Sequence, residues 1–229
     1  DRIHFEVGVQ PLQGVLDPAS FAQYAEACEL ADYCGGLPSR DRPTPEKHLD
    51  VILSLAKKLG KPVDVHIDQE NNPLENETEL LAEKTIEHGM QGRVFGVHAI
   101  SLSAKEDREQ DRIIEKVKEA DLGIIICPSA ALSMKQLPMS GPLHNSIAPY
   151  VKLREAGVRC YLGVDNVHDL FMPMVDGDIW TECRMLMEAT RFYDIDAVAE
   201  WACATPITAM AGVGAMDEAV PAKKRAAGA

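Results

Sequence analysis

The chain has 229 residues, 46% of them hydrophobic, so it is long enough to bury the core of one domain. Its formal net charge is −13 at pH 7, and it has no basic stripe to neutralise phosphates, which argues against a nucleic-acid partner. No apolar run approaches the roughly 18 residues of a membrane span, so we expect no transmembrane helix and no membrane partner.

Apolar, β-rich runs recur about every 30 residues, with helix-forming stretches between them. The expected strands are residues 3–9, 33–37, 63–67, 94–97, 122–127 and 158–164. The main expected helices are residues 21–30, 49–59, 80–88 and 113–120. This alternation of strand and helix predicts the α/β class with a parallel sheet.

Six βα units are visible, whereas a closed (β/α)8 TIM-type barrel has eight. We therefore expect residues 1–210 to form part of such a barrel, with the missing units supplied by a longer parent chain or a partner. A six-stranded parallel sheet left open would expose its edges and favour association, including homo-oligomer formation. Residues 211–229, which are rich in Ala and Gly, are expected to be a disordered tail.

The ends of the expected helices carry recognisable signals. Asp17 precedes Pro18 and is expected to cap the first helix, and Gly60 is expected to end the second. His48 falls on the amphipathic second helix and is expected to face solvent. Residues 128–149 and 167–178 are expected to be long loops, which are often functional.

The six cysteines form no C-x-x-C pair and lie mostly inside apolar runs. This pattern favours buried free thiols over a disulfide framework and predicts a reducing, cytoplasmic location. The sequence starts at Asp1, so a leader outside it stays open as an alternative.

Polar residues stand at or just after the ends of several expected strands, among them His66, His98 and Asp165. The carboxyl ends of barrel strands carry the chemistry, so these three residues are candidates for one site. A single histidine in a strand is more often a structural residue, but three such residues on different strands favour a functional site. Imidazole and carboxylate groups bind Zn²⁺ or Fe²⁺ and move protons.

Three motifs resemble the amidohydrolase superfamily, in particular its cytosine deaminase branch. They are VDVHIDQ at 63–69, GRVFGVHAIS at 92–101 and LGVDNVHD at 162–169, and the resemblance runs from about Ile3 to about Ala204. It implies that the strands are the third to eighth of a barrel and that one divalent metal, Zn or Fe, is bound. By the same resemblance, His66 is a metal ligand, Asp165 is a ligand and proton acceptor, and His98 contacts the attacking water or the substrate.

The chain departs from this family pattern in three places. No H-x-H pair occurs, so the metal shell would need ligands that this chain does not contain. Gln69 stands where cytosine deaminase has a proton-shuttling glutamate; Asp68, or His98 with Asp165, would then have to move protons. Leu12 falls at or near the family's third-strand substrate glutamine, with Gln10 and Gln13 beside it.

Two hypotheses follow from these residues. The first is a metal-dependent hydrolase of a C–N bond in a small, cyclic nitrogenous compound. Its catalytic residues would be Asp165 and His98, and its metal ligands His66 and Asp165. Its substrate-binding residues would be Gln69, Leu12, Gln13, Asn166, Phe171 and His168. The alternative is a non-catalytic truncated or split barrel that acts as a binding or scaffold subunit.

Overall fold

The structure, a computed structural model, describes residues 5–134, 147–203 and 207–212. Most of the expected tail, from residue 213 onward, lies outside the described residues. Six parallel strands form one sheet, in which each strand pairs with the next along the chain. They are β1 (Gly8–Val9), β2 (Tyr33–Gly36), β3 (Val63–Ile67), β4 (Val94–His98), β5 (Gly123–Ile126) and β6 (Arg159–Leu162). The predicted partial barrel of parallel βα units is therefore confirmed.

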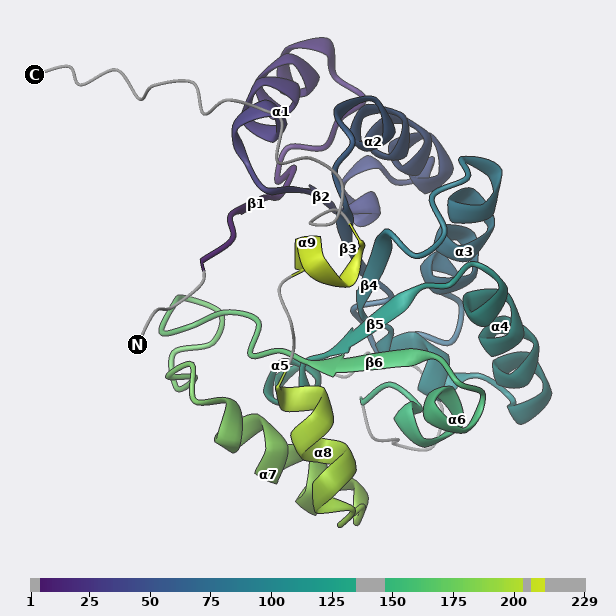
Figure 1. Cartoon of the computed structure of the whole chain (residues 1–229), viewed down its shortest axis with the longest axis vertical. Helices are drawn as coiled ribbons and strands as arrows, with labels where there is room; N and C mark the ends of the chain where they lie inside the picture. Colours follow the sequence, from purple (N-terminus) through teal and green to yellow (C-terminus); the bar gives the residue numbers. More distant parts are fainter. Residues whose placement is uncertain (1–4, 135–146, 204–206, 213–229) are drawn as a thin grey trace, which may run out of the picture.

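Most of the helices that follow the strands lie along the outer side of the curved sheet (Figure 1). The α-helices are α1 (Pro18–Leu30), α2 (Pro45–Leu59), α3 (Glu77–Glu87), α4 (Asp107–Glu119), α5 (Pro128–Ser133), α6 (Tyr150–Glu155), α7 (Ile179–Thr190), α8 (Ile195–Ala202) and α9 (Ile207–Met210). Two short 3-10 helices are η1 (Pro38–Asp41) and η2 (Ile100–Ala104). The prediction of a loop from residue 128 was wrong at its start, because Pro128 opens helix α5 rather than marking a loop.

The predicted helix signals act as expected in the described residues. The Asp17 carboxylate accepts the Ser20 N–H at 2.9 Å and caps α1. Gly60 ends α2 in the left-handed conformation, with a φ of 69°, where a side chain would be strained.

Successive side chains along a strand point to opposite faces of the sheet, which gives an apolar outer face and a polar inner face. In β3, Val63, Val65 and Ile67 are fully buried in the core cluster between sheet and helices. Asp64 and His66 lie at the intervening positions and face the interior of the partial barrel, where they line a cavity. The fold thus brings alternate residues of neighbouring strands to one inner surface.

His48 is a correction to the sequence analysis, because it is completely buried instead of facing solvent. Its Nδ1 lies 2.6 Å from a carboxylate oxygen of Asp41, and its Nε2 accepts the Leu37 N–H at 3.0 Å. The histidine therefore ties α2 to the turn that follows β2.

The predictions on cysteines and membrane spans are also tested by the structure. All six cysteines are free thiols, and all except Cys203 are buried. No helix in the described part of the chain is long and apolar enough to cross a membrane.

Candidate active site

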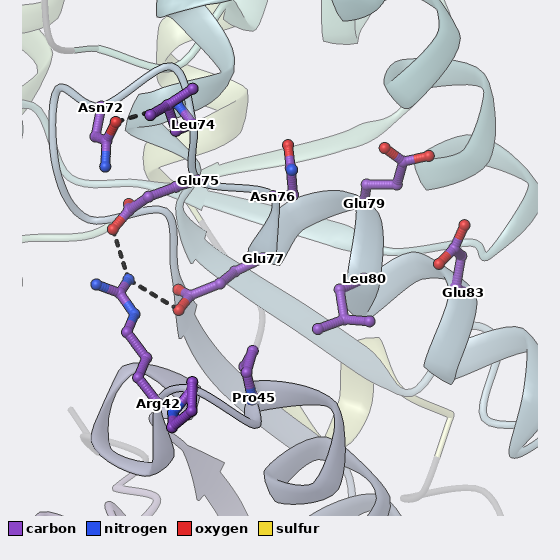
Figure 2. Close-up of a pocket in the computed structure, with 11 residues that line it drawn as sticks. Arg42, Pro45, Asn72, Leu74, Glu75, Asn76, Glu77, Glu79, Leu80 and Glu83 are labelled. Atoms are coloured by element: carbon purple, nitrogen blue, oxygen red, sulfur yellow. Dashed lines mark hydrogen bonds and ion pairs between the residues drawn. The ribbon is translucent and has the colours of Figure 1, made fainter.

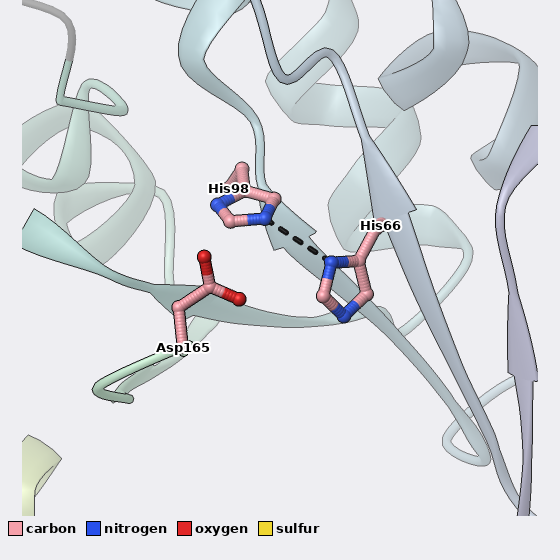
Figure 3. A group of neighbouring side chains, drawn as sticks. All are labelled: His66, His98 and Asp165. Carbon is pink, nitrogen blue, oxygen red and sulfur yellow. Dashed lines mark hydrogen bonds between the residues drawn. The ribbon is translucent and has the colours of Figure 1, made fainter. Parts of the chain in front are cut away.

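His66, His98 and Asp165 come together at the carboxyl ends of their strands, as the sequence predicts. Each residue offers a ligand atom, and these atoms lie within 4.8 Å of one another. His98 Nε2 is 3.2 Å from His66 Nδ1, and the Asp165 carboxylate faces both rings (Figure 3). The three residues are between 32 and 99 positions apart in the sequence, yet they share one small volume.

The backbone at the strand ends is bent sharply to aim these side chains. His98 has a φ of 80° and Asp165 a φ of 61°, both in the left-handed region that non-glycine residues seldom adopt. Such conformations cost of order 1–3 kcal/mol each and cluster at functional sites. The surrounding barrel therefore holds both residues in orientations that their own backbones disfavour.

A cavity of about 270 Å³ lies on the inner face of the sheet beside this cluster. Its lining residues are Gly8, Gln10, Tyr33, Asp64, His66, Val97, Ile125, Cys127, Gly163 and Asp165. His98 is not among the lining residues and only 2% of its surface is exposed, but its ligand atom lies within 4.8 Å of those of His66 and Asp165, which do line the cavity.

The sequence analysis did not assign two polar residues of this cavity to the site: Asp64 was not considered, and Gln10 was named only as a neighbour of Leu12. Asp64 Oδ1 lies 3.6 Å from His66 Nε2, and Gln10 Nε2 donates to Asp64 Oδ1 at 3.4 Å. The signal for Asp64 was available, because a residue two positions before His66 in a strand faces the same side. Gln10 follows β1, where no periodic pattern indicates which way a side chain points.

Burial dominates the electrostatics of the cluster. It lowers the pKa of His98 to about 3, helped by the neighbouring His66, so the His98 ring is neutral at pH 7. The pKa of Asp165 is raised by burial, with His66 opposing and Asp169 adding to the shift. Burial also raises the pKa of Asp64. The Asp165 carboxylate is therefore a stronger base than an exposed one.

The donor set fits a divalent transition metal. Imidazole nitrogen and carboxylate oxygen are the ligands that Zn²⁺ and Fe²⁺ accept. Three such atoms within 4.8 Å of one another are close enough to share one ion. In addition, His98 Nδ1 is buried and has no hydrogen-bond partner among the described residues.

None of the predicted substrate-binding residues is among the residues that line this cavity. Leu12 and Gln13 are exposed beyond β1, and Gln69 is half-buried after β3. The other three, Asn166, His168 and Phe171, lie on the segment after β6; Phe171 is exposed and lines a neighbouring, methionine-rich cavity of about 370 Å³. Their roles in binding stay predictions.

Asp68 has a structural position instead of the proton-carrying position considered from the sequence. It is fully buried, and its carboxylate accepts the Glu77 N–H at 2.8 Å, the Thr78 N–H at 3.1 Å and the Thr78 hydroxyl at 2.6 Å. These bonds anchor the start of α3, and Asp68 does not line the cavity.

A larger cavity, of about 540 Å³, lies between the turn after β2 and the start of α3 (Figure 2). Arg42 crosses it to pair with Glu75 at 2.5 Å and with Glu77 at 3.0 Å. The charged side chains that line this larger cavity are thus already in ion pairs. None of His66, His98 and Asp165 lines it. The smaller inner cavity is the candidate active site.

The fold and the cluster together are those of a partial TIM barrel with candidate functional residues at its strand ends. The chain belongs to the amidohydrolase family, whose model matches residues 33–214.

Two curated relatives and two solved structures are similar to the chain. An uncharacterized protein of Haemophilus influenzae is 40% identical over 143 residues, covering 61% of this chain and 52% of that protein. The pterin deaminase of Rhizobium rhizogenes is 23% identical over 215 residues, covering 93% of this chain and 48% of the deaminase.

Among solved structures, a 5-methylcytosine deaminase from Klebsiella pneumoniae superposes with a TM-score of 0.81 at 21% identity, covering 95% of this chain and 55% of that one. The N-isopropylammelide isopropylaminohydrolase of Burkholderia multivorans superposes with a TM-score of 0.72 at 24% identity, covering 91% of this chain and 51% of that one. The chain therefore spans about half the length of each of these four proteins.

Proposed function

We propose that the whole protein is a metal-dependent hydrolase that cleaves a C–N bond in a small, cyclic nitrogenous compound. The observation that carries this proposal is the cluster of His66, His98 and Asp165 within 4.8 Å at the strand ends of an amidohydrolase-type barrel. Relatives named for pterin, for N-isopropylammelide and for 5-methylcytosine support the substrate class.

In this proposal His66 and Asp165 hold one divalent ion, Zn²⁺ or Fe²⁺. The sequence has no H-x-H pair, so the remaining ligands come from outside it. When bound, such an ion acts as a Lewis acid that makes water more acidic and polarises the carbon under attack.

The chain's own residues would then move and hold protons. Asp165 accepts a proton from the attacking water, because burial has made its carboxylate more basic. His98 stays neutral and forms hydrogen bonds to the reacting groups without adding a positive charge. Gln69 and Asn166, with Leu12, Gln13, His168 and Phe171, would shape the entrance for the substrate.

Metal content measured beside turnover tests this function. His66→Ala and Asp165→Asn each remove a ligand, so both variants of the full-length protein should lose most of the bound metal and the activity. His88→Ala is a matched control, because His88 pairs with Asp50 at the end of α3, away from the cavity. Full metal occupancy in both ligand variants would refute the assignment.

The second candidate function is a non-catalytic scaffold or binding subunit, which the missing H-x-H pair and Gln69 favour. Negligible metal in the full-length protein, together with no hydrolysis of cyclic C–N compounds, would support it. In either case we propose that a further segment or a second copy completes the barrel. We also propose that the protein resides in the cytoplasm, whose reducing conditions keep thiols such as these free.

A further inference from the structure

Gln10 places an unpaired acceptor at the inner cavity. Its amide nitrogen Nε2 donates to Asp64 Oδ1 at 3.4 Å. Its amide oxygen Oε1 is buried and has no hydrogen-bond partner among the residues that the structure describes. Because Gln10 lines the same cavity as His66 and Asp165, this free acceptor adjoins the candidate reaction centre.

Asp64 decides which end of the amide is free. A carboxylate oxygen accepts hydrogen bonds, so it draws the NH₂ end of Gln10 toward itself and leaves the oxygen available. Asp64 is itself buried, with 8% of its surface exposed, and lies 3.6 Å from His66 Nε2. One carboxylate therefore connects the amide of Gln10 to the His66 side of the cavity.

Gly35 of β2 supplies the room for this arrangement. A Cβ on Gly35 would lie 2.6 Å from Gln10 Cδ, 2.7 Å from Gln10 Nε2 and 2.3 Å from the Val9 carbonyl oxygen. Any larger residue would displace the amide. The neighbouring strand thus leaves a space that the Gln10 side chain occupies.

A buried carbonyl oxygen without a partner is costly, and buried acceptors in proteins are nearly always satisfied. A ligand that enters the cavity with an N–H group would satisfy it. Leu12, which the sequence analysis put nearest the family's substrate glutamine, has an apolar side chain that is 63% exposed, so that side chain cannot accept a hydrogen bond from the ligand.

We propose that Gln10 Oε1 accepts a hydrogen bond from a ring N–H of the substrate, and that Asp64 is the positioning residue that orients this amide. This inference rests on the proposed function and names its substrate class more closely. The substrate is a ring of the lactam, cyclic urea or amidine type with an unsubstituted N–H at this edge. Analogues alkylated on that ring nitrogen are rejected, because they leave the acceptor unpaired.

The test uses the metal-loaded, full-length protein and three product-like rings with their N-methylated forms. The pairs are uracil and 1,3-dimethyluracil, cyanuric acid and trimethyl isocyanurate, and lumazine and 1,3-dimethyllumazine. Hydrolysis of cytosine, ammelide and pterin, the matching amino compounds, identifies the ring that the protein accepts. For that ring, calorimetry gives the ratio of dissociation constants between the N-methyl and N–H forms.

We expect the wild-type protein to favour the N–H form by about tenfold or more, the preference that one hydrogen bond supplies. Gln10→Met keeps the length of the side chain but removes the acceptor, so the ratio should fall toward one. Asp64→Asn should lower it too, because an asparagine N–H can bond to Gln10 Oε1 and occupy it. The matched control is Gln23→Met on the exposed surface of α1, which should keep the wild-type ratio.

The outcomes separate this inference from the proposed function. A ring that is hydrolysed while Gln10→Met discriminates as well as wild type overturns the role of Gln10 and leaves the hydrolase proposal intact. An unchanged ratio in Asp64→Asn overturns the positioning role of Asp64. If none of the three rings is bound or hydrolysed, the proposed function fails and this inference fails with it. Thermal unfolding and metal content confirm that each variant is folded and loaded.

Discussion

At the scale of single residues, His48 occupies a position where one ring serves two partners. Its Nε2 accepts the Leu37 N–H, so a proton on that nitrogen would break the hydrogen bond. Burial lowers the pKa of the imidazole, while the hydrogen bond and charge of Asp41 oppose the shift. The folded protein therefore keeps His48 neutral over a wider range of pH than the unfolded chain does.

This difference makes stability depend on pH. We expect the free energy of unfolding to decrease as the pH falls from about 7 to about 5, because the unfolded chain protonates His48 near its ordinary pKa of about 6.5 and the folded protein does not. His48→Gln keeps an acceptor but has no such proton, so its stability should vary less over the same range. Urea unfolding at several pH values measures both; parallel curves for the two proteins would contradict the prediction.

Gln69 provides a second test at this scale, which concerns catalysis. A neutral amide has no proton to exchange near pH 7, so Gln69→Ala should raise the barrier by only about 1–3 kcal/mol, as the loss of one buried hydrogen bond does. Asp165→Ala removes a ligand and a base and should reduce kcat/KM by more than about a hundredfold.

The sharper variant is Gln69→Glu, which restores the acid of the cytosine deaminase branch and should create or increase cytosine deamination. Steady-state kinetics on the native substrate and on cytosine separate these cases. Equal loss of activity in Gln69→Ala and Asp165→Ala would contradict the positioning role of Gln69.

How far the site could be predicted depends on whether each residue belongs to a periodic element. His66, His98 and Asp165 end buried strands, and strand ends of a parallel sheet meet at one edge. Asp64 follows from the two-residue period of β3. The orientation of Gln10, which follows β1, cannot be predicted from the period of that strand, because it depends on the space at Gly35 of a different strand. The burial of His48 is likewise a tertiary effect, since a helix periodicity does not reveal which turn packs on it.

At the scale of elements, helices α1 and α3 begin with carboxylates in contrasting surroundings. Asp17 caps α1 in solvent, whereas Asp68 reaches α3 from the loop after β3 and is completely buried. Asp68 accepts from two backbone N–H groups and the Thr78 hydroxyl. The Glu77 carboxylate in turn accepts the Asp68 N–H at 3.0 Å, so loop and helix bind each other reciprocally.

This contrast predicts unequal losses of stability. Asp68→Ala should lower the free energy of unfolding by about 3 kcal/mol or more, because it leaves buried donors without partners. Asp17→Ala should cost much less than this, since water replaces the exposed cap. Denaturant unfolding of both variants measures the difference. Similar losses for the two would show that the buried hydrogen bonds of Asp68 contribute no more than an exposed cap.

Elements were predictable where local signals and burial agree. The strands β2 to β6 lie within about two residues of the expected runs, because their apolar residues are buried against neighbouring strands and helices. In contrast, β1 has only two residues, since it pairs with β2 alone at the edge of the sheet. Helix α5 is six residues long, too short for a helical periodicity to emerge from the sequence.

At the scale of the whole molecule, the described sheet is an open arc. Within the described residues β1 and β6 each pair on one side only. Near β1, Phe5 and Val7 are 83% and 53% exposed. The number of βα units was predictable because each unit is a complete local pattern. What covers the two edges was not, because that depends on chain segments or copies other than these strands.

The open sheet and the strong negative charge have opposite effects on association between copies of the chain. Unpaired backbone groups and apolar side chains at the edges favour contact between copies, whereas a net charge of −13 keeps the copies apart. Raising the salt concentration from about 10 mM to about 150 mM shortens the screening length from about 30 Å to about 8 Å. Repulsion between copies then weakens, while burial of apolar edge surface is little affected.

We therefore expect the 229-residue chain to be largely monomeric at about 10 mM salt and to associate reversibly at about 150 mM salt. Sedimentation equilibrium at both salt concentrations measures the change in average mass. Val7→Ser removes exposed apolar surface beside β1 without altering the charge, so it should weaken association at the higher salt concentration. A monomer at both concentrations would show that the sheet edges are not adhesive. Association that weakens with salt would instead indicate that complementary charges hold the copies together.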